Sequence, residues 1–289
     1  MSSHWFAVAC GIIFICRPND AQQPGGGGHH PCLLSCKDQH MYAIQNVLGD
    51  VSEWSLEFIT PIQSILNRSP QGPATALMRI GAICQANQIY KKCLKACEPG
   101  KAREILIIGL SPWDYICKAY EEQGDFNLEI IPCWSENTLT LNQNCAKFGL
   151  ALHESLRGMA LAGADNPGYA NHLPKICNAI TYYDKCFLTE SDRFCGEKGW
   201  NFLLRLNEVT SKALYEMLRY AAVIDQIPAA CELWHSPQNY AAKHRQRLLG
   251  VRAVSNSSSA KPSALLPSTI LCILLLSSSF LLSLLFRSR

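Results

Sequence analysis

Two segments of this 289-residue chain share one arrangement: an Ile-Cys pair, eight residues with a tyrosine shortly before a lysine, and a second cysteine. The segments are Ile83 to Cys93 (ICQANQIYKKC) and Ile176 to Cys186 (ICNAITYYDKC). Both read as helix, and cysteines nine residues apart in a helix differ by about 900°, or half a turn in net rotation. The two cysteines of each segment therefore stand on opposite faces and cannot bond to each other. Each segment is predicted to be the central helix of a disulfide-stapled module.

The number of cysteines indicates complete pairing in an oxidising compartment. The chain has 15 cysteines, of which Cys10 and Cys16 lie in a predicted signal peptide, 1–21, and Cys272 lies in an apolar tail. The other twelve form an even set, which is typical of a secreted, disulfide-bonded protein. No Cys-x2-Cys pair and no His-x3-His pair occurs, so we expect no metal and no cofactor.

Helix geometry restricts which cysteines can meet. Cysteines four residues apart share one helix face, so two such pairs on antiparallel helices form two neighbouring bridges. For the first half this predicts Cys32–Cys97, Cys36–Cys93 and Cys84–Cys117. The second half has wider spacings, and by analogy we predict Cys133–Cys195, Cys145–Cys186 and Cys177–Cys231.

Apolar residues recur every three or four positions through most of the chain, which predicts an all-α fold. Pro61 interrupts the first helical run, and a break is expected near Thr189 to Gly199. The clearest apolar stripe, in a helix expected at about 135–161, comprises Leu141, Cys145, Phe148, Leu152, Leu156 and Met159. We predict two tandem modules of about three helices each, 32–125 and 126–235.

The segments that flank the helical region are predicted to be a flexible lead-in, a stalk and a membrane-attachment signal. Residues 22–31, QQPGGGGHHP, form a flexible lead-in, and residues 236–256 form a polar stalk. Residues 257–289 combine a short spacer with an apolar end, which is typical of a glycosylphosphatidylinositol (GPI) signal with attachment at Asn256 or Ser257. The alternative is a single transmembrane helix, for which the apolar run is short and rich in serine.

Charge and motifs exclude several function classes. A net charge of +3 is too small to indicate nucleic-acid binding. The stalk carries four basic residues, which are either simply solvated or contact anionic lipid or polysaccharide: Lys243, Arg245, Arg247 and Arg252.

Asn67 begins a glycosylation sequon, although Pro70 directly after it disfavours occupancy. No nucleophile elbow, zinc-protease motif or P-loop occurs, so no enzyme and no catalytic residue is expected.

The first half resembles the domain of the nematode chondroitin proteoglycan 4 type. The resemblance rests on four elements, namely Cys32-x3-Cys36, Ile83-Cys84, Cys93-x3-Cys97 and Tyr115-Ile116-Cys117, with a diverged second copy reaching residue 231. It implies a secreted or surface glycoprotein, some relatives carrying glycosaminoglycan. This chain has no Ser-Gly dipeptide, so it is not expected to carry chondroitin itself.

These observations predict a non-enzymatic protein at the extracellular face of the cell membrane, or secreted. Its expected partners are the membrane, through the lipid anchor or a transmembrane tail, and an extracellular protein or anionic glycan bound by the helical modules. A structural coat or matrix component is one alternative, and a single-pass receptor-like protein is the other.

Overall fold

The computed structural model describes residues 30–49, 61–69, 72–162 and 169–237. The chain divides into Met1–Arg245 and Gln246–Arg289, and all described residues belong to the first unit. The predicted signal peptide, the stalk beyond residue 237 and the tail lie outside the described residues. Within those residues there are eight α-helices and no strand, so the all-α prediction is confirmed.

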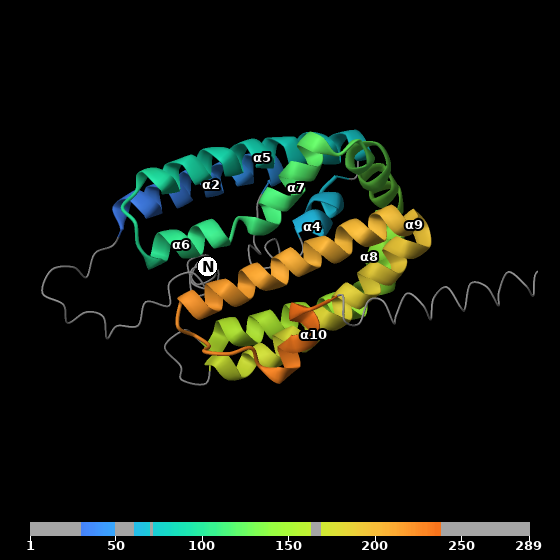
Figure 1. Ribbon diagram of the computed structural model, residues 1–289. Coiled ribbons are helices and arrows are strands. Elements are labelled where there is room, and N and C mark those ends of the chain that lie inside the picture. The colour runs from blue at the N-terminus through green and yellow to red at the C-terminus, as the bar shows by residue number, and fades with distance from the viewer. Residues whose placement is uncertain (1–29, 50–60, 70–71, 163–168, 238–289) are drawn as a thin grey trace, which may run out of the picture. The chain divides into compact units, whose positions relative to one another are not determined.

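Figure 1 shows the described helices in their order along the chain. The α-helices are α2 (Pro31–Leu48), α4 (Pro61–Asn67), α5 (Pro73–Ala96), α6 (Lys101–Ile108), α7 (Ser111–Glu122), α8 (Ile131–Ala162), α9 (Leu173–Tyr220) and α10 (Glu232–His235). One π-helical turn, η2 (Phe126–Ile130), and two 3-10 turns, η3 (Tyr169–His172) and η4 (Ala229–Cys231), join them. In the part that the structure describes, no helix is long and apolar enough to cross a bilayer.

Prolines determine where several helices begin. Pro31, Pro73 and Pro174 stand in the first turns of α2, α5 and α9, where the missing backbone N–H costs nothing. The N-cap of α7 is Leu110, whose backbone is already helical, and the hydroxyl of Ser111 donates to the carbonyl of Ile108 at 2.8 Å.

The predicted break in the last long helix is a kink at Gly196. Its φ of 68° and ψ of −159° are open to glycine and strained for other residues. The kink divides α9 into two arms, 173–195 and 197–220, which run back alongside each other (Figure 1). Apolar residues of both arms, such as Ile176 and Leu214, share one core cluster.

The largest hydrophobic core joins residues from both predicted modules. Phe202 of α9 lies at its centre, with ring centroids 5.0 Å from Tyr115, 4.7 Å from Phe126 and 5.9 Å from Trp134. Trp134 also donates its indole N–H to the hydroxyl of Ser191 at 2.8 Å. The segments on either side of residue 125 therefore pack as one body, and the described part of the first holds five α-helices against three in the second.

Candidate functional site

Six disulfides join the helices of the described region. They are Cys32–Cys97, Cys36–Cys93, Cys84–Cys117, Cys133–Cys195, Cys145–Cys186 and Cys177–Cys231. Their Cα–Cα distances, 4.9 to 5.8 Å, are normal for a disulfide. The pairs are the same as those expected from the spacing, and none crosses residue 125. Such dense bridging is the mark of an extracellular cysteine-rich helical protein.

Helix α5 holds its neighbours from both sides, as the nine-residue spacing requires. Cys84 bonds to Cys117 of α7, whereas Cys93 bonds to Cys36 of α2. Cys84 and Cys117 belong to the large core, so this bridge is enclosed by packed side chains.

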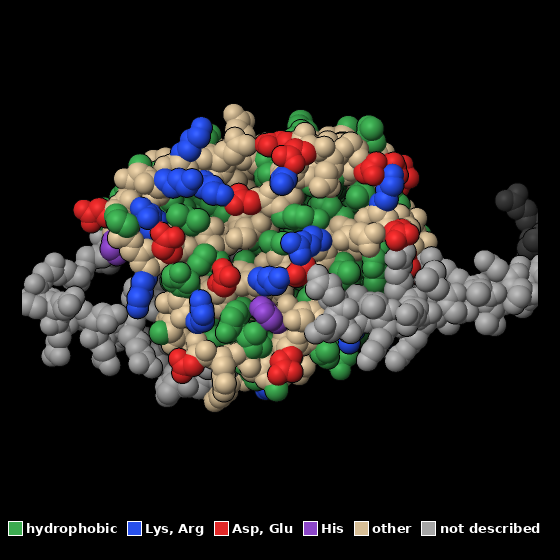
Figure 2. All heavy atoms as spheres, viewed as in Figure 1, with side chains coloured by type: hydrophobic (Ala, Val, Ile, Leu, Met, Phe, Trp, Pro, Cys, Tyr) green, Lys and Arg blue, Asp and Glu red, His purple; other side chains and the backbone are tan. Residues whose placement is uncertain are grey.

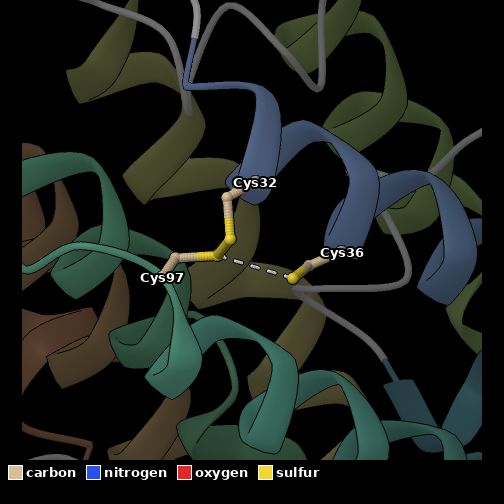
Figure 3. A group of neighbouring side chains, drawn as sticks. All are labelled: Cys32, Cys36 and Cys97. Atoms are coloured by element: carbon tan, nitrogen blue, oxygen red, sulfur yellow. Dashed lines mark hydrogen bonds between the residues drawn. A yellow bond between two sulfur atoms is a disulfide. The ribbon is translucent and has the colours of Figure 1, made fainter.

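Two bridges between α2 and α5 bring four sulfur atoms together. Figure 3 shows the Cys32–Cys97 bond and, beside it, the sulfur of Cys36, which is 3.7 Å from that of Cys97. The Sγ atoms of these three residues lie within 4.8 Å of one another, a spacing that could suit a metal ion. Each sulfur is held in a disulfide, however, and a metal would need the thiolate. In the oxidised protein this cluster is therefore a covalent link between the two helices.

Beyond the two disulfides, α2 and α5 are joined by a polar contact. His40 lies one helical turn beyond Cys36, and its Nε2 hydrogen-bonds the amide oxygen of Asn87 at 2.7 Å. Its ring stacks on that of Tyr90 at 4.2 Å between centroids and 11° between planes. Burial lowers the pKa of His40, and the bond to Asn87 opposes this in part. The imidazole is thus a neutral packing element between the two helices.

The α8 and α9 pair carries an aromatic and basic surface, here called the Phe148–Tyr182 surface, made of Lys147, Phe148, Tyr182 and Lys185. The two rings come from different helices and stack at 6.4 Å and 20°. Lys147 Nζ lies 4.8 Å from the Phe148 ring centroid, and Lys185 Nζ lies 5.9 Å from that of Tyr182. Tyr182 is 58% exposed although it is a large aromatic residue. The nearby Cys145–Cys186 bridge fixes the two helices against each other.

A short C-terminal cap, η4 and α10, covers the open end of the α9 hairpin. Cys231 bonds to Cys177, and the indole N–H of Trp234 donates to Asp184 Oδ2 at 3.2 Å. The Ser211 hydroxyl donates to the backbone carbonyl of His235 at 3.3 Å. A cavity of about 20 Å³ lies among these residues, which has room for about one water and is too small for an organic ligand.

Asp184 is the most perturbed carboxyl group of the described region. It is only 4% exposed, and burial raises its pKa from 3.8 to about 8, which the hydrogen bond from Trp234 opposes. Burial also raises the pKa of the adjacent Tyr183, with a contribution from Asp184. This carboxyl group is enclosed under the cap, so it is a structural feature with no route to a substrate.

Of the remaining predicted site residues, the structure describes only Asn67. Asn67 is exposed at the end of α4, and the amide of Asn142 donates to its side-chain oxygen, whereas a glycan would be attached to its amide nitrogen. The attachment residues Asn256 and Ser257 and the four basic residues of the stalk lie outside the described residues.

Sequence reasoning did not find the Phe148–Tyr182 surface. Phe148 belonged to the predicted core stripe of its helix, whereas in the structure it is only partly buried at the edge of that stripe. The signal available in the sequence was the adjacency of Lys147 to Phe148 and the spacing of Tyr182 and Lys185, which are three residues apart on one helix face.

No protein-family model, no curated protein and no solved structure matches this chain. The resemblance to the chondroitin proteoglycan 4 type domain therefore stays a prediction. The class of protein that the fold defines is an extracellular, cysteine-rich, all-α protein.

Proposed function

We propose that this protein is a non-enzymatic binding module, GPI-anchored at the extracellular face of the membrane, whose ligand is an anionic glycan. The observation that carries the proposal is the Phe148–Tyr182 surface. The resemblance to a secreted or surface domain family and the apolar tail support the setting. The proposed arrangement is two disulfide-closed halves, 32–125 and 126–235, which present this surface on a rigid body.

The chemistry of the surface suits a charged sugar. Tyr182, which is 58% exposed, offers apolar ring area against which the C–H groups of a pyranose ring can pack. The ammonium group of Lys147 lies 4.8 Å from the Phe148 ring centroid, where it can donate to a carboxylate or sulfate. Lys185 Nζ lies 5.9 Å from the Tyr182 ring centroid. The acidic neighbour Glu190 is already engaged, because its Oε2 accepts from the amide of Asn144 at 2.7 Å and lies 3.7 Å from Arg193.

We do not base the proposal on a large positively charged surface. On the face drawn in Figure 2, Lys and Arg side chains alternate with Asp and Glu side chains. Several cations are also neutralised by ion pairs, such as Lys91 with Asp114 at 2.5 Å and Lys198 with Asp125 and Glu129 at 3.0 and 2.8 Å. We therefore favour a local site over diffuse attraction, with the basic stalk as a second contact.

Replacing Phe148 and Tyr182 together by alanine is expected to weaken binding of chondroitin sulfate about tenfold, through loss of the apolar contact that the aromatic pair offers. The measurement is binding of fluorescent chondroitin sulfate to cells that lack their own glycosaminoglycans and display the full-length protein. Lys147→Ala with Lys185→Ala should weaken binding and flatten its dependence on salt.

The matched controls are Tyr42→Ala, which removes a tyrosine of α2 that is more exposed than Tyr182, and Lys118→Ala, which removes an exposed lysine on α7. Both should leave binding unchanged. Equal binding by the double variant and the wild type would exclude this surface as the site. No binding by the wild type, to sulfated or desulfated chain, would exclude the glycan and leave a protein ligand or the structural coat.

Phosphatidylinositol-specific phospholipase C is expected to release the full-length protein from the cell surface, since the tail has the composition of a lipid-attachment signal. Flow cytometry before and after treatment measures the release. A variant carrying Asn256→Leu and Ser257→Leu should no longer be released, because attachment requires small residues. Retention of the wild type after treatment would favour a transmembrane helix instead.

A further inference from the structure

The twin bridges between α2 and α5 differ from the other four disulfides because they touch each other. The sulfur atoms of Cys36 and Cys97 belong to different bridges and lie 3.7 Å apart, in contact without being bonded (Figure 3). These two residues are 2% and 5% exposed. Their bonded partners are more accessible, since Cys32 is exposed and Cys93 is only partly buried. Each bridge thus joins a more exposed residue to a buried one, and the sulfurs of the two buried residues are in contact.

We propose that these four cysteines form a thiol-exchange site for a low-molecular-weight thiol such as glutathione, with entry at Cys32 and relay through Cys97 and Cys36. This inference is independent of the glycan-binding proposal. Exchange proceeds when a thiolate attacks one sulfur of a disulfide and the other sulfur departs as a thiolate. Because Cys32 is the only exposed residue of the four, we take it as the residue that an outside thiolate attacks first.

The relay has two balanced steps. In the first, the glutathione thiolate bonds to Cys32 Sγ, the Cys32–Cys97 bond breaks, and Cys97 departs as a thiolate. In the second, the Cys97 thiolate bonds to Cys36 Sγ, the Cys36–Cys93 bond breaks, and Cys93 departs as a thiolate. The number of disulfides is unchanged and no electron is gained or lost. The product carries glutathione on Cys32, a Cys36–Cys97 bridge and a free thiol at Cys93, which can then displace glutathione from Cys32.

The second step requires only a short movement. The Cys97 sulfur needs to approach that of Cys36 by about 1.7 Å to reach bonding distance. The guanidinium of Arg103, which is shared with Glu104, donates to the backbone carbonyl of Cys97 at 3.1 Å. Throughout the exchange at least one bridge still joins α2 to α5, so the helices stay together.

The test is disulfide mapping of the full-length protein after exposure to glutathione without oxygen and quenching with N-ethylmaleimide. Trypsin separates Cys93 from Cys97 at Lys95, and chymotrypsin separates Cys32 from Cys36 at Leu33 or Leu34. We expect a Cys36–Cys97 peptide and roughly tenfold more alkylation at Cys93 than at Cys97. The reason is that a Cys97 thiolate formed in contact with its target disulfide reacts with it faster than with an alkylating reagent that must diffuse to it. Glutathione is expected on Cys32 until Cys93 displaces it.

A double variant, Cys36→Ala with Cys93→Ala, removes the relay and keeps the entry bridge. Alkylation should then move to Cys97. The Cys133–Cys195 bridge is an internal control, since both residues are partly buried and, among the described residues, its sulfurs do not cluster with those of a second bridge. Wild-type protein that carries glutathione on Cys32, alkylated Cys97 and an intact Cys36–Cys93 bridge would overturn the proposal. So would an unmodified Cys32 at a glutathione concentration that already opens Cys133–Cys195.

Discussion

Removing the Cys177–Cys231 bridge by double alanine substitution is expected to lower the free energy of unfolding by about 4 kcal/mol. The bridge closes a loop of 54 residues, and in the chain-entropy account its loss frees the unfolded chain by that amount. It also leaves the cap held by Trp234 and the Ser211 contact alone. Denaturant unfolding of the full-length protein in mild detergent measures the loss, and proteolysis after residue 228 should rise with it.

The matched control is Cys32→Ala with Cys97→Ala. The adjacent Cys36–Cys93 bridge still closes a loop of 57 residues there, so only a small additional loop is released and the expected loss is about 2 kcal/mol. Equal losses in the two variants would mean that loop closure does not govern the contribution of these bridges.

Asp184→Asn is expected to raise the free energy of unfolding at pH 8 by about 1–3 kcal/mol. Asparagine has nearly the same shape and keeps an oxygen that can accept from Trp234, but it cannot ionise. In the folded protein the pKa of Asp184 is raised from 3.8 to about 8, so folding favours the protonated carboxyl group. Its contribution to stability is complete below pH 3.8 and is lost as the pH rises from there to about 8.

The pH dependence separates this account from a simple packing effect. Between pH 5 and 8 the stability advantage of Asp184→Asn over the wild type should grow, because only the wild type loses stability through this group as the pH rises. Asp38→Asn, at an exposed position of α2, is the control and should show a constant difference. An advantage independent of pH would show that Asp184 does not titrate in this range.

Local geometry was enough to predict the bridges and most helices. Cys93 and Cys97 share a helix face whatever surrounds them, and the prolines at 61 and 73 limit where a helix can begin. The kink at Gly196 lies within the break expected from residues 189–199 for the same local reason.

What the sequence did not indicate depends on contacts between distant segments. The period of each helix shows that it has an apolar face but not which partner covers it, so the core around Phe202, which joins Tyr115 to Trp134, was not foreseen. Asp184 would ordinarily be placed on the surface, and only the cap folding over it buries the carboxyl group. Phe148 followed the core period of its helix, yet α9 leaves it at the edge, where it meets Tyr182.

The Cys177–Cys231 bridge also determines how mechanical load would enter the molecule. If the chain is tethered through its C-terminus, tension along the tether reaches Cys231 and passes through the covalent bridge to Cys177 in the first arm of α9. A ligand pulling at Tyr182 would then be linked to Cys231 by five residues of helix and one disulfide. Residues 183–230, with the whole second arm, lie outside that shortest covalent path, so they could remain folded while the connection bears force.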